Sequence, residues 1–197
     1  MVMKITIDDR RMRRFVREMP KASNRSVSRA LNKAITGTRT HAARAISAKR
    51  NIKVGRARDE MRLYKASPAK PEAAIVARSN PIKLMEVKGA KTQTKRGVTV
   101  KIGPGPRHLY EGAFIAKTKS GHIGVFTKES KLTHKSKGDS PGTKRFNLPI
   151  IEIALPSVAA TLVQKDIDKL LRDFAVPVYE KELIRLLEFE MKKHGAR

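Results

Sequence analysis

The side chains with the widest chemical repertoire in this chain are its histidines, at His41, His108, His122, His134 and His194. None lies in a His-Glu-x-x-His pair or at another tight metal-ligand spacing, which argues against a metal site. His122 follows a turn glycine and precedes an apolar alternation, where a structural hydrogen bond is expected more often than catalysis. The histidines therefore predict neither a metal centre nor a catalytic base.

Carboxylates and serines give no stronger indication of catalysis. The closest acidic pairs are Asp8-Asp9, which suits a helix cap, and Asp166-x-Asp168, whose spacing of two does not bring the side chains together on a helix. No Gly-x-Ser-x-Gly turn marks a nucleophilic serine. The sequence therefore predicts a protein that is not an enzyme and needs no cofactor.

The composition is that of a folded protein. The chain has 197 residues, 40% of them hydrophobic, and contains no cysteine, which excludes disulfides and cysteine-based metal sites. No apolar run approaches the roughly 20 residues that span a membrane, and the start of the chain lacks the apolar block of a signal peptide. We expect a soluble protein that is made in the cytoplasm and makes no membrane contact.

Positive charge is the strongest compositional signal. The formal net charge is +26, of which +14 falls in residues 1–65 and +12 in residues 66–150, whereas residues 151–197 are balanced. A chain this basic attracts acidic partners, above all nucleic-acid phosphate. The neutral C-terminal part suits contacts between proteins instead.

The clearest element that positions these charges is a long helix from about Ser23 to Lys49. Its apolar positions, from Val27 to Ile46, repeat at helical spacing and are mostly small, which suits close packing against a sheet or another helix. The opposite face is basic and carries Arg25, Arg29, Lys33, Arg39 and Arg44. This face is either an ordinary solvated surface or a stripe that contacts phosphate or an acidic partner.

Short alternating segments predict strands between about residues 61 and 150. The best defined are Met61–Lys65, Glu72–Arg78, Gly97–Ile102 and the pair Gly112–Lys117 and His122–Thr127. A turn at Ser120-Gly121 joins that pair. Ile82–Val87 fits a strand or a loop, and Pro149 interrupts Phe146–Ile151. The expected fold class is α+β, with a mostly antiparallel sheet packed against the long helix.

A basic loop interrupts the strands from residue 128 to 144. It carries Lys128, Lys131, Lys135, Lys137 and Lys144. A segment of this length without apolar periodicity is uncommon in a compact domain, so we expect a mobile arm or one that a partner orders. With the basic helix, this arm makes up the predicted contacts with DNA or an acidic partner.

Two amphipathic helices are expected after Pro156-Ser157. The side chains Ala159, Val163, Ile167, Leu170 and Phe174 recur at helical spacing, which predicts that they form one buried face. Val176-Pro177 should kink or break the first helix, and a second should run from about Tyr179 to Lys193. We divide the chain into a basic core domain, 1–155, and a helical region, 156–197. The apolar side chains expected to contact neighbouring subunits are Leu170, Phe174, Leu183, Leu186, Leu187 and Met191.

The segment from residue 112 to 158 resembles the minor tail protein Z family of long-tailed phages and prophages. The residues that carry the resemblance are Phe114, Ile115, Gly121, His122, Gly124, Val125, Phe126, Leu148, Pro149, Pro156, Ser157 and Val158. Two earlier segments fit the same layout, Arg29-Ala30-Leu31-Asn32-Lys33-Ala34 and Leu63-Tyr64-Lys65-Ala66-Ser67. The similarity covers about Ala22 to Leu187, and the 128–144 loop is longer than the family's usual hairpin.

The resemblance implies a structural virion protein, assembled in the host cytoplasm, that completes the tail near its head-proximal end or neck. It also implies a six-fold ring of identical subunits, contacts with other tail or neck proteins, and genomic DNA passing through or stopping near the lumen. The residues alone leave open an alternative, a stand-alone protein that binds nucleic acid without sequence preference. Such a protein would use phosphate contacts, because aromatic residues for base stacking make up only 5% of the chain.

Overall fold

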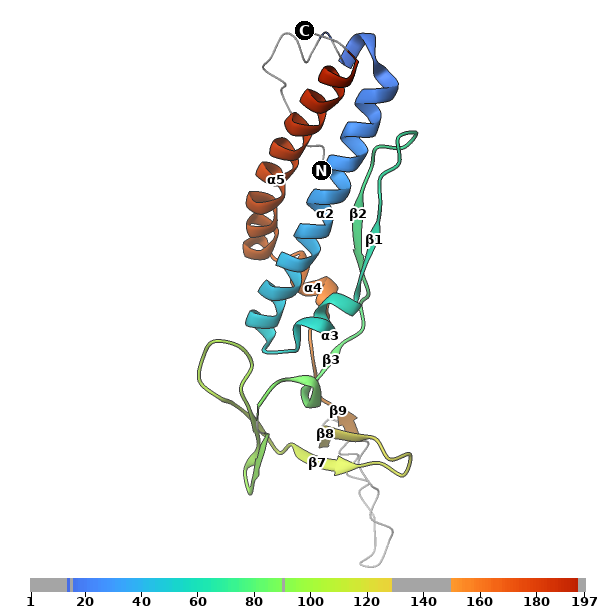
Figure 1. Cartoon of the computed structure of the whole chain (residues 1–197). Coiled ribbons are helices and arrows are strands. Elements are labelled where there is room, and N and C mark those ends of the chain that lie inside the picture. Colours follow the sequence, from blue (N-terminus) through green and yellow to red (C-terminus); the bar gives the residue numbers. More distant parts are fainter. Residues whose placement is uncertain (1–13, 15, 90, 129–149, 195–197) are drawn as a thin grey trace, which may run out of the picture. The chain divides into compact units, whose positions relative to one another are not determined.

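The computed structural model describes residues 14, 16–89, 91–128 and 150–194. The structure is α+β, as predicted, with a long N-terminal helix, antiparallel strands and C-terminal helices (Figure 1). The chain forms two compact units. Unit 1 comprises residues 1–46, 54–79 and 158–197, and unit 2 comprises residues 47–53 and 80–157. The boundary predicted after residue 155 stays a prediction, although unit 1 unites the helices beyond it with the N-terminal helix.

Unit 1 is built around two long helices, α2 (Pro20–Arg50), of which the residues up to Ile46 belong to this unit, and α5 (Lys165–Lys193). Figure 1 shows them side by side and antiparallel. The residues of their shared core are Ala30 and Ala34 on α2 and Tyr179, Leu183, Leu186 and Leu187 on α5. The α2 side chains at this contact are small, so the larger α5 side chains fill the space and are only 1–8% exposed. The prediction that small residues allow this helix to pack closely is confirmed.

The break between the C-terminal helices lies earlier than predicted. The helix α4 (Val158–Leu162) ends before Val163, and α5 then continues through Pro177. Pro177 lacks an N–H donor, but it lies on the exposed side of α5, where water can bond to the carbonyl oxygen that loses its partner. The break at residues 163–164 shifts the helical phase. Val163 and Leu170, predicted on the buried face, are therefore 79% and 39% exposed.

A short helix and a hairpin complete unit 1. The helix α3 (Val54–Asp59) leads into β1 (Met61–Tyr64), which pairs antiparallel with β2 (Ala74–Ala77). The side chain of Met61 is buried and that of Leu63 half-buried, whereas those of Arg62 and Tyr64 are exposed. The hairpin therefore has one inward face and one face that carries a charged and an aromatic side chain in solvent.

The described residues of unit 2 form three small sheets, in which the strands pair antiparallel. One consists of β3 (Ile82–Lys83) and β10 (Ala154–Leu155), and the 3-10 helix η1 (Leu84–Glu86) follows β3. The second consists of β4 (Thr92–Thr94), β5 (Gly97–Val100) and β6 (His108–Glu111). The third consists of β7 (Phe114–Lys117), β8 (Ile123–Lys128) and β9 (Ile150–Glu152). The predicted antiparallel pairing is confirmed, and the strands are distributed over several sheets.

Candidate functional site

The β7–β8 hairpin carries most of the signature residues, which are the residues on which the family resemblance rests. At its turn the N–H of Thr118 donates to the carbonyl oxygen of His122 at 2.7 Å, and Gly121 has a φ of 87°. A glycine suits this position because a Cβ disfavours such a φ. On β8, Val125 and Phe126 are 1% and 6% exposed. The Phe126 ring lies 6.2 Å from that of Phe114 on the neighbouring strand, so the signature aromatics form part of the core of unit 2.

His122 belongs to a cluster of three titratable side chains. Its Nε2 lies 2.8 Å from Oε1 of Glu152 on β9, and Nζ of Lys83 lies 3.3 Å from that nitrogen and 3.3 Å from Oε2 of Glu152. Burial raises the pKa of Glu152, but hydrogen bonds and charges from His122 and Lys83 outweigh this effect and leave the pKa lowered. A histidine that acts as a catalytic base faces a hydroxyl or thiol that it activates, whereas the ring nitrogen of His122 faces the amine of Lys83. The structural hydrogen bond predicted for His122 is confirmed.

Gly124 lies against the same carboxylate. A Cβ at this position would be 2.8 Å from Oε1 of Glu152 and 2.8 Å from the Phe126 ring, so no larger residue fits without displacing them. On β7, the N–H of Ile115 donates to Oε1 of Gln93 at 3.0 Å, which ties this sheet to β4. These signature residues therefore have structural roles.

The end of the signature leads into α4. Pro156 is exposed, Ser157 is 8% exposed and Val158, the first residue of α4, is fully buried. The helix start predicted at Pro156-Ser157 is confirmed. The remaining signature residues, Leu148 and Pro149, lie outside the described part of the chain.

Asn32 connects the two earlier segments that fit the family layout. Its Nδ2 donates to the carbonyl oxygen of Ala66 at 2.9 Å, and its Oδ1 accepts from the N–H of Ala66 at 2.8 Å. The side-chain amide thus pairs with the main chain as a neighbouring strand would. This pair holds the residues after β1 against α2, within unit 1.

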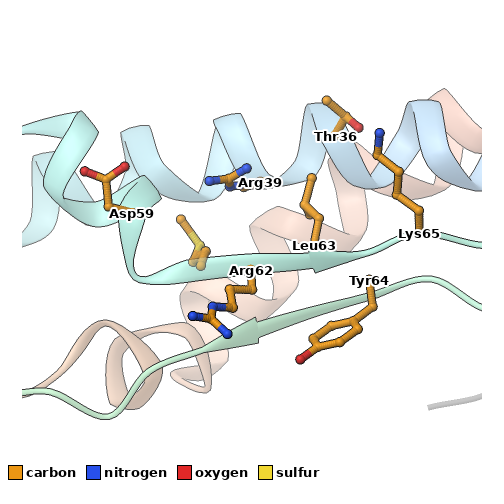
Figure 2. A pocket seen from close by; sticks show the side chains of 8 residues that line it. Thr36, Arg39, Asp59, Arg62, Leu63, Tyr64 and Lys65 are labelled. Atoms are coloured by element: carbon orange, nitrogen blue, oxygen red, sulfur yellow. The ribbon is translucent and has the colours of Figure 1, made fainter.

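A groove of about 750 Å³ lies between α2 and β1. Its lining residues are Thr36, Arg39, Asp59, Met61, Arg62, Leu63, Tyr64 and Lys65. Figure 2 shows Leu63 and Lys65 pointing from β1 toward α2, and Arg62 and Tyr64 pointing to the opposite side of the strand. The groove contains three cationic side chains and one carboxylate, so its charge suits an anionic ligand.

The basic side chains predicted on the long helix do not all share one environment. Arg25, Arg29 and Arg44 are exposed on α2, and Lys33 is exposed near Glu182 of α5. The hydrogen bond from Arg185 lowers the pKa of Glu182, and the charge of Lys33 adds to this effect.

Arg39 differs from the other four because it lies partly buried in the groove. Its Nη2 donates to the carbonyl oxygen of Arg58 at 3.0 Å, and its Nε is buried without a hydrogen-bond partner among the described residues. Arg39 is therefore less accessible than the other four, because the hairpin covers this side of the helix, and its contact with DNA or an acidic partner stays a prediction.

Of the predicted basic arm, the structure describes only Lys128, which ends β8 and is exposed. The other arm residues named above, Lys131, Lys135, Lys137 and Lys144, lie outside the described ranges. Their contact with DNA or an acidic partner stays a prediction.

Most of the side chains expected at subunit contacts pack within the chain. Leu183, Leu186 and Leu187 belong to the α2–α5 core, and Met191 packs against it. The Phe174 ring stacks on His41 with a centroid distance of 4.6 Å. The three leucines are only 1–8% exposed and have little surface left for another subunit, so we assign them to the core. Phe174 and Met191 are only partly buried, and their subunit contacts stay predictions. Leu170, at 39% exposed, keeps its predicted role at a subunit contact as a prediction.

Among the described residues, no group of three or more histidines, cysteines, aspartates or glutamates is placed to hold a metal ion. Within the same part of the chain, no helix is both long and apolar enough to cross a membrane.

The groove and the Asn32 contact are features that sequence patterns did not reveal. Asn32 and Ala66 are 34 residues apart, and a polar residue on a helix gives no sign of its partner. The alternation of Met61–Lys65 did predict a strand, and with it the opposite orientations of Arg62 and Leu63. Only the fold shows that the side of this strand that carries Leu63 and Lys65 faces α2.

The chain matches the family of prophage minor tail protein Z (GPZ) over residues 10–193. Neither a curated protein nor a solved structure matches it significantly. The family match includes the β7–β8 hairpin with its glycines and both segments that Asn32 connects. It also covers almost all of the 197 residues. The chain therefore belongs to the prophage minor tail protein Z family, and is a minor tail protein of a phage.

Proposed function

We propose that this protein completes the phage tail near its neck, where identical subunits assemble into a six-fold ring. The observation that carries the proposal is the family match over residues 10–193, because it spans both units and not one shared motif. The protein acts as a structural part of the virion. Its subunits contact one another and neighbouring tail or neck proteins, and are assembled in the host cytoplasm.

The charge distribution supports a contact with an acidic partner. The exposed side chains of Arg25, Arg29 and Arg44 line α2, and the chain as a whole has a net charge of +26. In the proposed ring these basic surfaces face the genomic DNA in the lumen or acidic surfaces of other tail proteins. Contacts with DNA phosphate would be independent of sequence and would weaken as salt rises.

A structural role without catalysis fits the environment of the most reactive side chains. His122 contacts Glu152 and Lys83 within a sheet, and His41 stacks on Phe174. Both rings therefore have partners that hold the fold together. We propose that the protein is not an enzyme and acts through its surfaces.

Inactivating the gene in the phage that encodes the protein tests this proposal. The expected result is a loss of infectious particles while heads and tail tubes still form, with infectivity restored by the wild-type protein supplied in trans. The stand-alone nucleic-acid-binding alternative predicts a stable monomer that binds duplex DNA and is absent from purified particles. Normal infectivity of particles that lack the protein would contradict tail completion.

A further inference from the structure

Along the edge of β1 that faces away from β2, the main-chain N–H and C=O groups point outward, where another strand could pair with them. The N–H of Arg78 donates to the carbonyl oxygen of Glu60 at 2.9 Å, so these two residues form a hydrogen-bonded pair of the antiparallel ladder. Such pairs alternate along a ladder with pairs whose main-chain groups point outward. With Met61 opposite Ala77 and Leu63 opposite Ile75, the N–H and C=O groups of Met61 and Leu63 point away from β2.

This outward edge borders the groove between α2 and β1. The groove is lined by five consecutive residues, 61–65, and no residue of β2 contributes to it. Its volume of about 750 Å³ lies in the range of ligand-binding clefts and is open to solvent. Met61 is only 1% exposed, so an extended peptide reaches the main chain at the half-buried Leu63 and the exposed Lys65, and there can add to the hairpin as a third strand.

The side chains around this edge specify the charge of the added strand. Arg39 and Lys65 lie on the side of β1 that faces α2, and Arg62 lies on the other side (Figure 2). The buried Nε of Arg39 has no hydrogen-bond partner among the described residues, and neither Arg62 nor Lys65 forms an ion pair with any of those residues. A strand alternates its side chains between the two faces, so carboxylates on successive residues would meet these cations in turn.

We infer that the β1 edge binds an extended, carboxylate-rich segment of another tail protein by strand addition. A peptide fits better than duplex DNA, because the edge offers both N–H donors and C=O acceptors, whereas phosphate oxygens only accept. That the partner is a tail component rests on the proposed function. The binding of a carboxylate-rich peptide does not depend on it.

Fluorescence anisotropy with the full-length protein tests this inference. The probe is a labelled eight-residue peptide in which pairs of successive glutamates alternate with pairs of valines, so that both faces of the added strand carry carboxylates. We expect saturable binding that Arg62→Glu with Lys65→Glu weakens by about tenfold or more. The matched control, Lys169→Glu with Lys181→Glu, changes the net charge equally on exposed positions of α5 and should leave the affinity unchanged.

Two altered peptides separate strand addition from charge attraction. Replacing glutamate by glutamine removes the carboxylates, and methylating alternate main-chain nitrogens removes the donors that face β1. Both changes should abolish saturable binding. The inference is overturned if the wild-type protein does not bind the peptide, if both double variants weaken binding equally, or if the methylated peptide binds as well as the parent.

A failure of the strand-addition site can also be distinguished from a failure of the proposed function. Particles that incorporate the protein while the isolated chain fails to bind the peptide would overturn the strand-addition site and leave tail completion intact. A chain that binds the peptide but never enters particles would contradict tail completion, and the groove would then serve a different acidic partner.

Discussion

At the scale of single residues, Gly124 shows why the family hairpin uses a glycine within a strand. Replacing it with alanine places a methyl group 2.8 Å from the Glu152 carboxylate and the Phe126 ring. We expect Gly124→Ala to lower the free energy of unfolding by about 1–3 kcal/mol, the usual cost of overpacking. Urea denaturation measures the change. Gly105→Ala is the matched control, because a Cβ there meets nothing within 4 Å; equal effects of both variants would contradict this explanation.

Glu152 gives a prediction about pH. His122 and Lys83 hold its pKa below the ordinary value despite burial, which acts in the opposite direction. A carboxylate with a lowered folded-state pKa stabilises the fold above its unfolded pKa of about 4.3, and this contribution is lost as the pH falls through the folded pKa.

The difference in unfolding free energy between the wild type and Glu152→Gln should therefore be largest above about pH 5 and shrink at lower pH. Urea denaturation of both proteins between neutral and acidic pH measures this difference. A difference that stays constant over the range would show that the ionised carboxylate is not what stabilises the cluster.

At the scale of elements, the Asn32 side chain is the contact that ties α2 to the segment after β1. Asn32→Ala leaves the N–H and C=O of Ala66 without this partner and should cost about 1–3 kcal/mol. Amide hydrogen exchange should show faster exchange in residues 61–67, with little change in unit 2. Asn24→Ala, on the exposed face of the same helix, provides the control. Unchanged exchange in this segment would mean that the Asn32 contact does not hold the hairpin.

The elements differ in how well sequence patterns predict them, for physical reasons. The small apolar positions of α2 and the alternation of β7 and β8 are direct consequences of burial, so periodicity found them. The residues of β4, Thr92–Thr94, are polar and fully exposed, and therefore show no apolar alternation. The α4–α5 break was misplaced at Pro177, because proline is a strong local signal while the tertiary packing of α5 is not visible in sequence.

The candidate site was less predictable than the fold. A helical projection places Arg39 with Arg25 and Arg29, but it cannot show that Arg39 points into a groove beside β1. The subunit contacts predicted for Leu183 and Leu187 likewise came from a helical projection alone. An apolar helix face predicts burial without stating whether the partner is the same chain, and here α2 of the same chain provides the partner.

At the scale of the whole molecule, the basic arm gives a prediction about assembly. Lys131, Lys135 and Lys137 fall in a stretch of strong positive charge within a chain of net charge +26. Replacing all three with glutamate should lower the yield of infectious particles, because the change repels DNA or an acidic tail protein. Circular dichroism and thermal denaturation of the isolated variant should match the wild type. An unchanged particle yield would exclude the arm from tail completion.

The copy number of the protein in purified tails is the most direct test of the proposed six-fold ring. Quantitative mass spectrometry of particles, together with a cryo-electron microscopy map of the neck region, gives this number and the symmetry of the assembly. A six-fold ring that completes the tail requires six copies per tail, arranged as one ring at the head-proximal end. Absence of the protein from purified tails, or its presence as scattered single copies along the tube, would contradict it.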